Sequence, residues 1–243
     1  MTKATDPVAR TAELEQGLAA VRSRIAAATK ASGRASEPTL IVVTKFHPAE
    51  DVRRLAGLGV TDVGENRDQE ASAKAEALQD LGLNWHFVGQ LQSKKAKSVV
   101  RYAHAVHSVD RPQLADGLAR AVAAEQDRSG RRALECFIQV SLDDDAGAHR
   151  GGAAPADVQS LAEQLAAADS LVLAGVMAVA PLGAAPEESF EKLAAISARL
   201  TAEHPAATGI SAGMSQDLEV AIRFGATHLR IGSDILGSRP AVG

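Results

Sequence analysis

Short apolar runs alternate with amphipathic helical stretches along most of this 243-residue chain, and this alternation limits its fold more than any other feature. The first run, TLIVVTKF at 39–46, is rich in β-branched residues. Seven further runs predict strands, at 60–66, 84–90, 105–110, 133–142, 171–180, 209–215 and 228–233. Strands that alternate with helices are parallel and have right-handed crossovers. Eight such units predict a closed (β/α)8 TIM barrel, with an open doubly wound sheet as the alternative.

Proline and glycine mark where the predicted helices begin and end. The segments 48–58, 155–168 and 186–203 each open with proline, which fits the first helical turn. Asp110 is the expected N-cap of the next helix, and Gly225 is the expected C′ residue of a short helix at 216–224. A further helix is expected at 8–31. No linker-like stretch separates the units, so residues 1–243 are interpreted as one domain, with 1–38 as its N-terminal helical extension.

Composition and charge argue against several classes of protein. The formal net charge is −4 and the apolar fraction is 46%, which indicates neither a nucleic-acid partner nor a membrane-surface partner. The N-terminus has no signal-peptide core, and no apolar run reaches the length of a membrane span. The single cysteine, Cys136, fits a reducing compartment. We therefore expect a cytoplasmic protein, and a monomer because no long exposed apolar stripe is evident.

Lys45 is the most informative polar residue at the carboxyl ends of the predicted strands, where an α/β barrel carries its working face. Period-2 alternation puts Ile41, Val43 and Lys45 on one face of the first strand. If that face points into the barrel, Lys45 caps an apolar stack. Burial of a lysine lowers its pKa and makes the neutral amine a nucleophile for an aldehyde. The alternative is that Lys45 extends from the barrel rim into solvent.

Two stretches that contain glycine and serine follow the seventh and eighth strands, where barrels commonly bind phosphate. They are SAGMS at 211–215 and RIGS at 230–233, and Gly213 and Gly232 permit close backbone approach. The alternative is that they are ordinary helix N-caps and turn glycines. A lysine amine and a phosphate cradle at one barrel mouth meet the requirements of pyridoxal 5′-phosphate (PLP). Arg230 then faces the ring nitrogen and keeps it unprotonated, unless it forms a structural ion pair instead.

Six sequence motifs carry a resemblance to a known family. They are VTKFHP (43–48), GEN (64–66), WHFVGQLQSKK (85–95), GVMAVAP (175–181), SAGMSQDLEVAI (211–222) and RIGSDILG (230–237). In this order they resemble the YggS/PROSC family of PLP-binding homeostasis proteins, which is similar to the N-terminal barrel domain of alanine racemase. The resemblance covers the chain from about residue 40 to its end.

The resemblance implies a cofactor site. Lys45 matches the lysine that forms a Schiff base with PLP, Asn66 matches a residue beside the ring, and Met177 matches a residue that lines the pocket. Arg230 matches the arginine near the ring nitrogen. The remaining matches belong to the phosphate loops after the seventh and eighth strands: Ser211, Gly213, Met214, Ser215, Gly232 and Ser233.

This sequence departs from the family pattern at two places. His47 stands where the family often has a second lysine, and His149-Arg150-Gly151 stands where it often has Lys-Ser-Gly. These changes leave the implied cofactor site intact. They argue against roles assigned to the auxiliary lysines, such as holding a second PLP molecule.

The choice between an enzyme and a cofactor carrier depends on a second base. In the resembling racemases, a tyrosine from a C-terminal β-domain acts opposite the Schiff-base lysine. We expect no such domain in this chain, because position 243 follows the eighth predicted strand closely, and its only tyrosine, Tyr102, is expected at the N-terminal face of the barrel. We therefore expect intracellular PLP storage and delivery, with apo-forms of PLP-dependent enzymes as partners. The alternatives are a PLP-dependent racemase of low activity and a Schiff-base barrel enzyme that acts on a sugar phosphate.

Two charged clusters lie outside the implied site. Lys94, Lys95 and Lys97 form a basic patch that could attract phosphate or a client apoenzyme, although such a patch is usually a solvated helix face. The acidic run at 143–145 is expected to be a solvated loop, and no metal site is predicted.

The histidines of the third and fourth strands are interpreted as structural. His86 is expected to be packed and hydrogen-bonded within the third strand. His104 and His107 are expected near or below the middle of the barrel, where they are not predicted to bind a ligand.

Overall fold

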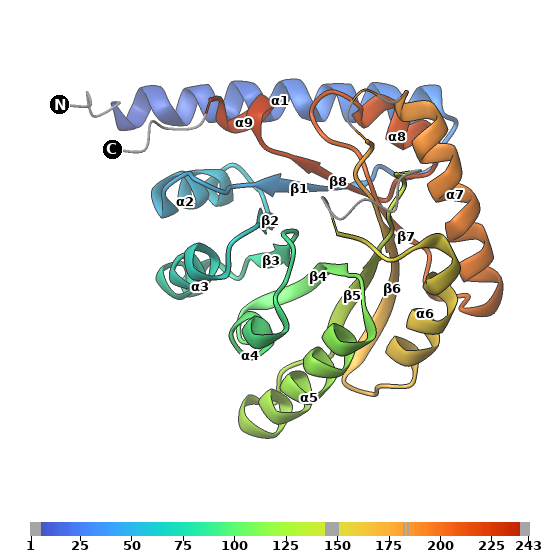
Figure 1. Ribbon diagram of the computed structural model, residues 1–243. Coiled ribbons are helices and arrows are strands. Elements are labelled where there is room, and N and C mark those ends of the chain that lie inside the picture. The colour runs from blue at the N-terminus through green and yellow to red at the C-terminus, as the bar shows by residue number, and fades with distance from the viewer. Residues whose placement is uncertain (1–5, 144–150, 182, 184, 239–243) are drawn as a thin grey trace.

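The eight predicted strands form one closed parallel barrel, in which neighbours in sequence pair with one another and the eighth strand pairs with the first (Figure 1). The computed structural model describes residues 6–143, 151–181, 183 and 185–238. This arrangement confirms the (β/α)8 TIM barrel. The strands are β1 Thr39–Val43, β2 Asp62–Glu65, β3 Asn84–Phe87, β4 Ala103–Val109, β5 Leu134–Gln139, β6 Leu171–Met177, β7 Gly209–Ser211 and β8 His228–Ile231.

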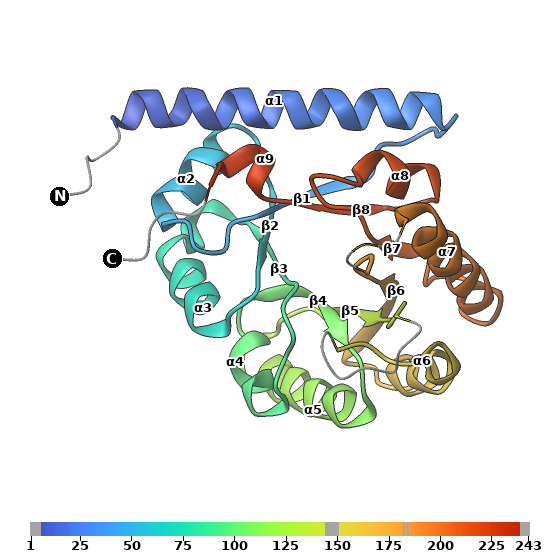
Figure 2. The same ribbon diagram turned by 45° about the horizontal axis from the view of Figure 1, so that its top comes forward.

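Helices surround the barrel, as two views of the molecule show (Figures 1 and 2). The helix predicted at 186–203 is found with the same bounds. The α-helices are α1 Pro7–Ala31, α2 Ala49–Gly57, α3 Asp68–Ala77, α4 Ala96–Val99, α5 Pro112–Ser129, α6 Val158–Ala166, α7 Pro186–Glu203, α8 Leu218–Arg223 and α9 Ser233–Leu236, and short 3₁₀ turns occur at η1 Gln79–Leu81, η2 Ser93–Lys95 and η3 Pro155–Asp157.

Several strands end earlier in the structure than the sequence pattern predicts. β1 ends at Val43 where the sequence pattern predicts an end at 46, and β7 ends at Ser211 where the pattern predicts an end at 215. The apolar pattern continues past each end, but the backbone turns: Phe46 has a φ of 69° and Gly213 a φ of 94°, and neither fits a strand. Lys45 and most of the predicted phosphate-binding residues therefore lie in loops beyond the strands.

The predicted N-cap of α5 is wrong. Arg111 occupies the cap position and makes no capping hydrogen bond through its side chain. The carboxylate of Asp110 instead pairs with Arg111 and accepts a hydrogen bond from the Gly152 amide at 3.4 Å. Gly225, with a φ of 92°, does follow the C-terminal end of α8 as expected.

Alternate residues of each strand face two different environments. In β8, Leu229 and Ile231 belong to the main hydrophobic core with residues of the helices, whereas the buried Arg230 between them does not. Ile41 of β1 pairs with Arg230, so it faces the same side, and Val43 follows two residues later. The predicted inward face of β1 is therefore confirmed for Ile41 and Val43.

The N-terminal helix α1 lies across one side of the barrel, along α8 and α9 (Figures 1 and 2). Its buried residues Leu14, Leu18, Val21 and Ile25 follow helical spacing. At Gly17 a Cβ atom would lie 2.8 Å from the Asp234 carbonyl oxygen, so glycine permits the close approach of α1 to α9. Among the described residues, no helix combines the length and apolar character needed to cross a membrane.

Candidate functional site

Lys45 is partly buried and lies two residues beyond β1, in a tight turn at the carboxyl end of the barrel. The Thr44 amide donates a hydrogen bond to the Gly64 carbonyl oxygen at 2.9 Å, and the His47 amide closes the turn by donating to the Thr44 carbonyl oxygen at 3.1 Å. Phe46 has a φ of 69°, a left-handed conformation that is uncommon for phenylalanine. The surrounding structure must therefore hold this turn in place.

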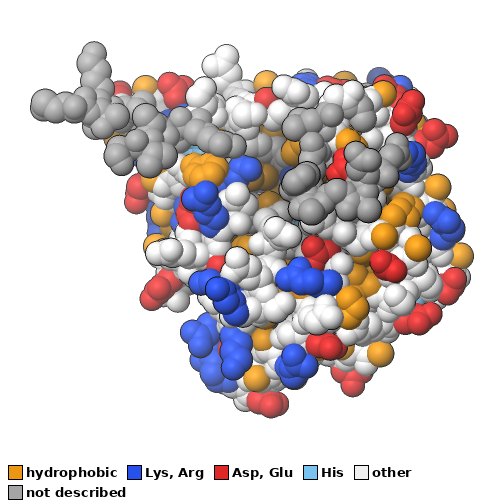
Figure 3. Space-filling model, in the orientation of Figure 1, with side chains coloured by type: hydrophobic (Ala, Val, Ile, Leu, Met, Phe, Trp, Pro, Cys, Tyr) orange, Lys and Arg blue, Asp and Glu red, His pale blue; other side chains and the backbone are white. Residues whose placement is uncertain are grey.

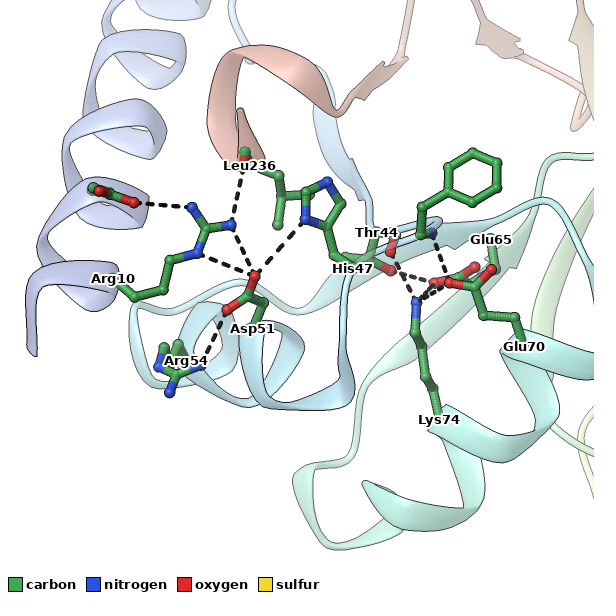
Figure 4. A network of polar contacts seen from close by, with 11 residues as sticks. Arg10, Thr44, His47, Asp51, Arg54, Glu65, Glu70, Lys74 and Leu236 are labelled. Carbon is green, nitrogen blue, oxygen red and sulfur yellow. Dashed lines mark hydrogen bonds and ion pairs between the residues drawn. The ribbon is translucent and has the colours of Figure 1, made fainter. Parts of the chain in front are cut away.

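A polar cluster from β2 and α3 fixes both neighbours of Lys45 (Figure 4). The Thr44 hydroxyl donates to the Glu65 carboxylate at 2.6 Å, and the Phe46 amide donates to the Glu70 carboxylate at 2.7 Å. Lys74 joins the two acids, because its ammonium lies 2.7 Å from Glu65 and 2.6 Å from Glu70. It also donates to the Thr44 carbonyl oxygen at 2.9 Å. Burial raises the pKa of Glu65, although Lys74 opposes that shift.

A second cluster ties His47 to α1 and α9 (Figure 4). The Asp51 carboxylate lies 3.8 Å from His47 Nδ1 and 2.8 Å from the Arg10 guanidinium. Arg10 also donates to the Leu236 carbonyl oxygen at 3.0 Å. Burial lowers the pKa of His47 despite the attraction of Asp51. The turn that carries Lys45 is thus connected to three helices on this side: α1, α2 and α9.

The loops after β7 and β8 lie next to each other. The hydroxyl of Ser215, in the loop after β7, is 3.2 Å from the hydroxyl of Ser233, which follows the loop after β8 as the first residue of α9. Arg24 of α1 reaches the loop after β7 and the helix α9, since it donates to the Ser215 carbonyl oxygen at 2.8 Å and to the Asp234 carboxylate at 2.7 Å. It also pairs with Glu219 of α8 at 2.7 Å. Helix α1 therefore connects the predicted phosphate loop after β7 to α9, which directly follows the predicted phosphate loop after β8.

Close packing restricts the glycines of these loops. At Gly213, which has a φ of 94°, a Cβ atom would lie 2.7 Å from Ala221 Cβ. At Gly232 it would lie 3.0 Å from the Val43 carbonyl oxygen, so the loop after β8 packs against the end of β1. The next residue after Gly213, Met214, is 39% exposed, and its amide donates to the Asp217 carboxylate at 2.6 Å.

Arg230 is buried inside the barrel. Its guanidinium donates to the Ser211 hydroxyl at 2.7 Å and to the Ala178 carbonyl oxygen at 2.9 Å. Both of these partners are neutral. Among the described residues, Arg230 is therefore held by hydrogen bonds and not by the structural ion pair that was the alternative. Burial lowers the pKa of Arg230 to about 10, and the guanidinium therefore stays protonated at neutral pH.

Two further predicted residues lie at the ends of β2 and β6. Asn66 follows β2, and Gly89 packs so closely on its backbone that a Cβ atom there would lie 2.2 Å from the Asn66 carbonyl oxygen. Met177 ends β6 and is 2% exposed, in a small cluster with Ala105 and Phe137 that is separate from the main core. The predicted residues thus gather at the carboxyl end of the barrel, and the structure directly joins Ser211 with Arg230 and Ser215 with Ser233.

Sequence reasoning missed several residues that support this region. Glu70 and Lys74 form an i, i+4 pair on α3, a signal that was available in the sequence. Arg24 gave no such signal, because its contacts lie about 190 residues away along the chain. His107, interpreted as structural, contacts the predicted site directly through the Ser211 hydroxyl at 2.8 Å. Asp144, Asp145, His149 and Arg150 lie outside the described residues.

Comparison with known proteins places the chain in a family. Residues 17–240 match the family model described as alanine racemase, N-terminal domain. The pyridoxal phosphate homeostasis protein of Mycobacterium tuberculosis is 44% identical over 246 residues, which cover 95% of this chain and 94% of that protein. Its counterpart in Escherichia coli is 34% identical and covers 93% of this chain and 97% of that protein. The chain belongs to the pyridoxal phosphate homeostasis protein family.

A solved structure of a family relative supports the same conclusion. PipY of Synechococcus elongatus, in a structure with PLP bound, has 33% sequence identity to this chain and a TM-score of 0.79, and the match covers 92% of this chain and 100% of that chain. The resemblance drawn from the sequence motifs is thereby confirmed. Those motifs contain every predicted site residue, so family membership and local geometry point to the same end of the barrel.

Proposed function

We propose that this chain binds PLP as a Schiff base on Lys45 and serves in the storage and delivery of PLP in the cytoplasm. The observation that carries this proposal is the rigid turn around Lys45, which packs beside the joined loops after β7 and β8. An amine held in a fixed position can attack the aldehyde carbon of PLP, with loss of one water molecule as the imine forms. Relatives named for PLP homeostasis, and PipY with PLP bound, support the choice of ligand.

The residues present fit this cofactor. The side-chain oxygen of Asn66 is buried and has no hydrogen-bond partner among the described residues, so a ligand with a hydroxyl or N–H donor would satisfy it. Ser215 and Ser233 would donate to the phosphate, and Ser211, Gly213, Met214 and Gly232 would shape the loops around it. Arg230 would donate to the ring nitrogen, and Met177 would line the ring pocket. When bound, PLP supplies an aldehyde for Schiff-base exchange and a ring that withdraws electrons.

A carrier role follows from the position of Tyr102, which precedes β4 at the N-terminal face of the barrel. Its hydroxyl donates to Asp68 at 3.4 Å, and burial together with Asp68 raises its pKa. Tyr102 packs against the main hydrophobic core and not in the barrel interior, so a tyrosine held protonated there is not placed to act as the second base of a racemase. We therefore propose that the chain releases its cofactor to apo-forms of PLP-dependent enzymes and turns over amino acids slowly.

The basic patch is the proposed contact for such clients. Lys94, Lys95 and Lys97 are exposed, and Figure 3 shows Lys and Arg side chains gathered on the same side of the molecule as α4. Lys95 pairs with Asp68 at 3.3 Å, so Lys94 and Lys97 are the better candidates to meet an acidic surface. We propose that the chain acts as a monomer in this exchange.

The test is the visible absorption spectrum of the purified chain with PLP, before and after borohydride reduction. We expect a Schiff-base band that becomes covalent on reduction in the parent and in Lys94→Ala, an exposed-lysine control, but not in Lys45→Ala. The same samples are assayed with L-alanine, and slow racemisation is expected. Brisk racemisation would establish a PLP-dependent racemase. Absence of the band in the parent would refute PLP binding and favour a Schiff-base enzyme for a sugar phosphate.

A further inference from the structure

A row of hydrogen-bonding side chains crosses the barrel interior and ends at the predicted cofactor residues. The Asp62 carboxylate of β2 lies 2.9 Å from His86 Nε2, and His86 Nδ1 lies 2.9 Å from His107 Nε2. His107 Nδ1 lies 2.8 Å from the Ser211 hydroxyl, which accepts a hydrogen bond from Arg230 at 2.7 Å. Side chains of five strands, β2, β3, β4, β7 and β8, thus form one continuous path.

The two ends of this path fix its direction. Arginine has no hydrogen-bond acceptor, so Arg230 must donate to Ser211. Burial alone would raise the pKa of Asp62, but hydrogen bonds from His86 and Thr61 lower it to about 2. The carboxylate of Asp62 is therefore ionised at neutral pH and can only accept, so His86 must carry a proton on Nε2.

The protons between the ends follow from this direction. A neutral His86 with its proton on Nε2 can only accept at Nδ1, so the proton of that contact belongs to Nε2 of His107. His107 then accepts at Nδ1 from the Ser211 hydroxyl. In this arrangement every donor in the path has an acceptor, both imidazoles are neutral, and opposite charges stand at the two ends.

The other arrangement needs a doubly protonated His86 and a proton on Nδ1 of His107. It deprives the Ser211 hydroxyl of its acceptor and adds a second cation to an interior that already holds Arg230. His107 is fully buried and stacks on Phe137 with ring centroids 4.3 Å apart. Burial lowers the pKa of His107 well below the usual value, and burial lowers the pKa of the adjacent His228 to about 4. The interior therefore disfavours a further positive charge.

We propose that His86 and His107 are positioning residues for Arg230: two neutral imidazoles, each protonated on Nε2, that link its guanidinium through Ser211 to the carboxylate of Asp62. A carboxylate in direct contact would also orient Arg230, but it would neutralise the charge locally. The longer path fixes the guanidinium while the balancing charge stays at the far end of the barrel. Arg230 is then suited to a ligand that presents a neutral acceptor, such as an unprotonated pyridine nitrogen. The choice of this ligand rests on the proposed function.

The first test uses the wild-type chain without PLP, so it is independent of cofactor binding. Long-range ¹H–¹⁵N correlation spectra distinguish the protonated and unprotonated ring nitrogens of each histidine, with signals assigned from His86→Phe and His107→Phe. We expect both residues to be neutral, with Nε2 protonated and Nδ1 unprotonated. A doubly protonated His86, or a proton on Nδ1 of His107, would overturn the proposal.

The second test asks whether the path transmits a change. Asp62→Asn removes the terminal charge and does not alter any group in contact with His107. We expect the ring ¹⁵N signals of His107 to shift in this variant and to stay unchanged in Asp80→Asn, a control in which the exposed partner of Arg53 is altered. Unchanged His107 signals in Asp62→Asn would show that the contacts do not act as a connected path.

The third test asks whether the path affects the affinity for PLP. His107→Phe retains a ring that can stack on Phe137 but removes both hydrogen bonds, and we expect PLP to bind about tenfold more weakly, the loss expected for one hydrogen bond. His104→Phe is the matched control on the same strand, where the histidine is exposed and faces Glu135. Equal PLP affinity in the two variants would refute positioning of the ligand-facing Arg230. Failure of wild-type PLP binding would refute the proposed function and leave the spectroscopic tests standing.

Discussion

Replacing Lys74 with methionine tests whether the polar cluster of Thr44, Glu65, Glu70 and Lys74 is needed for the stability of the fold. Lys74 is 7% exposed and Glu65 is 1% exposed, and the two make a 2.7 Å ion pair. Methionine keeps much of the side-chain volume but leaves the Glu65 carboxylate without its cation. Removal of one partner from a buried pair costs about 3–5 kcal/mol of unfolding free energy.

The structure places the expected loss at the lower end of that range. Glu70, the second acid of the cluster, is 25% exposed and can regain water, while Glu65 keeps the hydrogen bond from the Thr44 hydroxyl. We therefore expect Lys74→Met to lower the unfolding free energy by about 3 kcal/mol at neutral pH. Lys97→Met, which alters an exposed lysine of α4, should change it by less than about 0.5 kcal/mol.

The loss should also depend on pH in a defined direction. Burial already raises the pKa of Glu65, and removal of Lys74 removes the opposing effect. The folded chain then binds a proton more tightly at Glu65 than the unfolded chain does. Stability must therefore increase as the pH falls through the window above the ordinary glutamate pKa. Lys74→Met should regain part of its lost stability on mild acidification.

Urea denaturation of wild type, Lys74→Met and Lys97→Met between pH 5 and 8 is the assay, with fluorescence of the single tryptophan, Trp85, as the signal. A loss of less than about 1 kcal/mol at neutral pH would refute the argument that the ion pair is needed, since a stranded buried charge costs more. A variant that becomes less stable than wild type by a growing margin on acidification would refute the assignment to Glu65.

Three further perturbations test other parts of the site. Arg24→Ala removes the contacts to the predicted phosphate loop after β7 and to α9, so equilibrium dialysis should find PLP bound about fivefold or more weakly. Arg53→Ala, which breaks an exposed pair elsewhere, should leave the affinity for PLP unchanged. Gly213→Ala puts a Cβ 2.7 Å from Ala221 Cβ at a φ of 94°, so thermal unfolding should begin at a clearly lower temperature; an unchanged midpoint would contradict the packing argument. The pKa of His228 falls to about 4 through burial. The stability that the neutral imidazole contributes is therefore complete above the ordinary histidine pKa and is lost as the pH falls from there toward 4. Replacement of His228 by phenylalanine should flatten the pH dependence of the melting temperature in that range.

The order and type of the elements were predictable because each strand and helix has a local pattern. The apolar runs located all eight strands, and proline and length defined α7 to the residue. Strand ends were less predictable, since the residues after β1 and β7 continue the apolar or small-residue pattern. The turn that follows β1 is held by the hydrogen bond from the Phe46 amide to Glu70, which comes from a helix later in the chain. The interpretation of 1–243 as one domain stays a prediction.

Site residues were predictable where their chemistry depends on the residue type at the end of a strand. They were not predictable where their role depends on a contact with a residue far away in the sequence. Lys45 and the glycine–serine loops stood out because few other functions require those residues at those places. His86 and His107 did not stand out, because the sequence of one strand does not indicate which of its histidines contacts a serine from another strand. The barrel interior brings Ser211 within 2.8 Å of His107 only after closure.

Helix α1 explains how the turn of Lys45 and the predicted phosphate loops can keep a fixed distance from each other, although neither part of the candidate site lies on this helix. Arg10 joins the His47 side through Asp51 and the Leu236 carbonyl, and Arg24 joins the predicted phosphate loop after β7 to α9, which follows the other predicted phosphate loop. The two arginines are separated by about 21 Å along one continuous helix, given a rise of 1.5 Å per residue. A rigid element of that length transmits a displacement at one end to the other. The turn of Lys45 and the phosphate loops should therefore move together, and loosening α1 should weaken a ligand that spans them even though α1 does not supply any of the predicted ligand-binding residues.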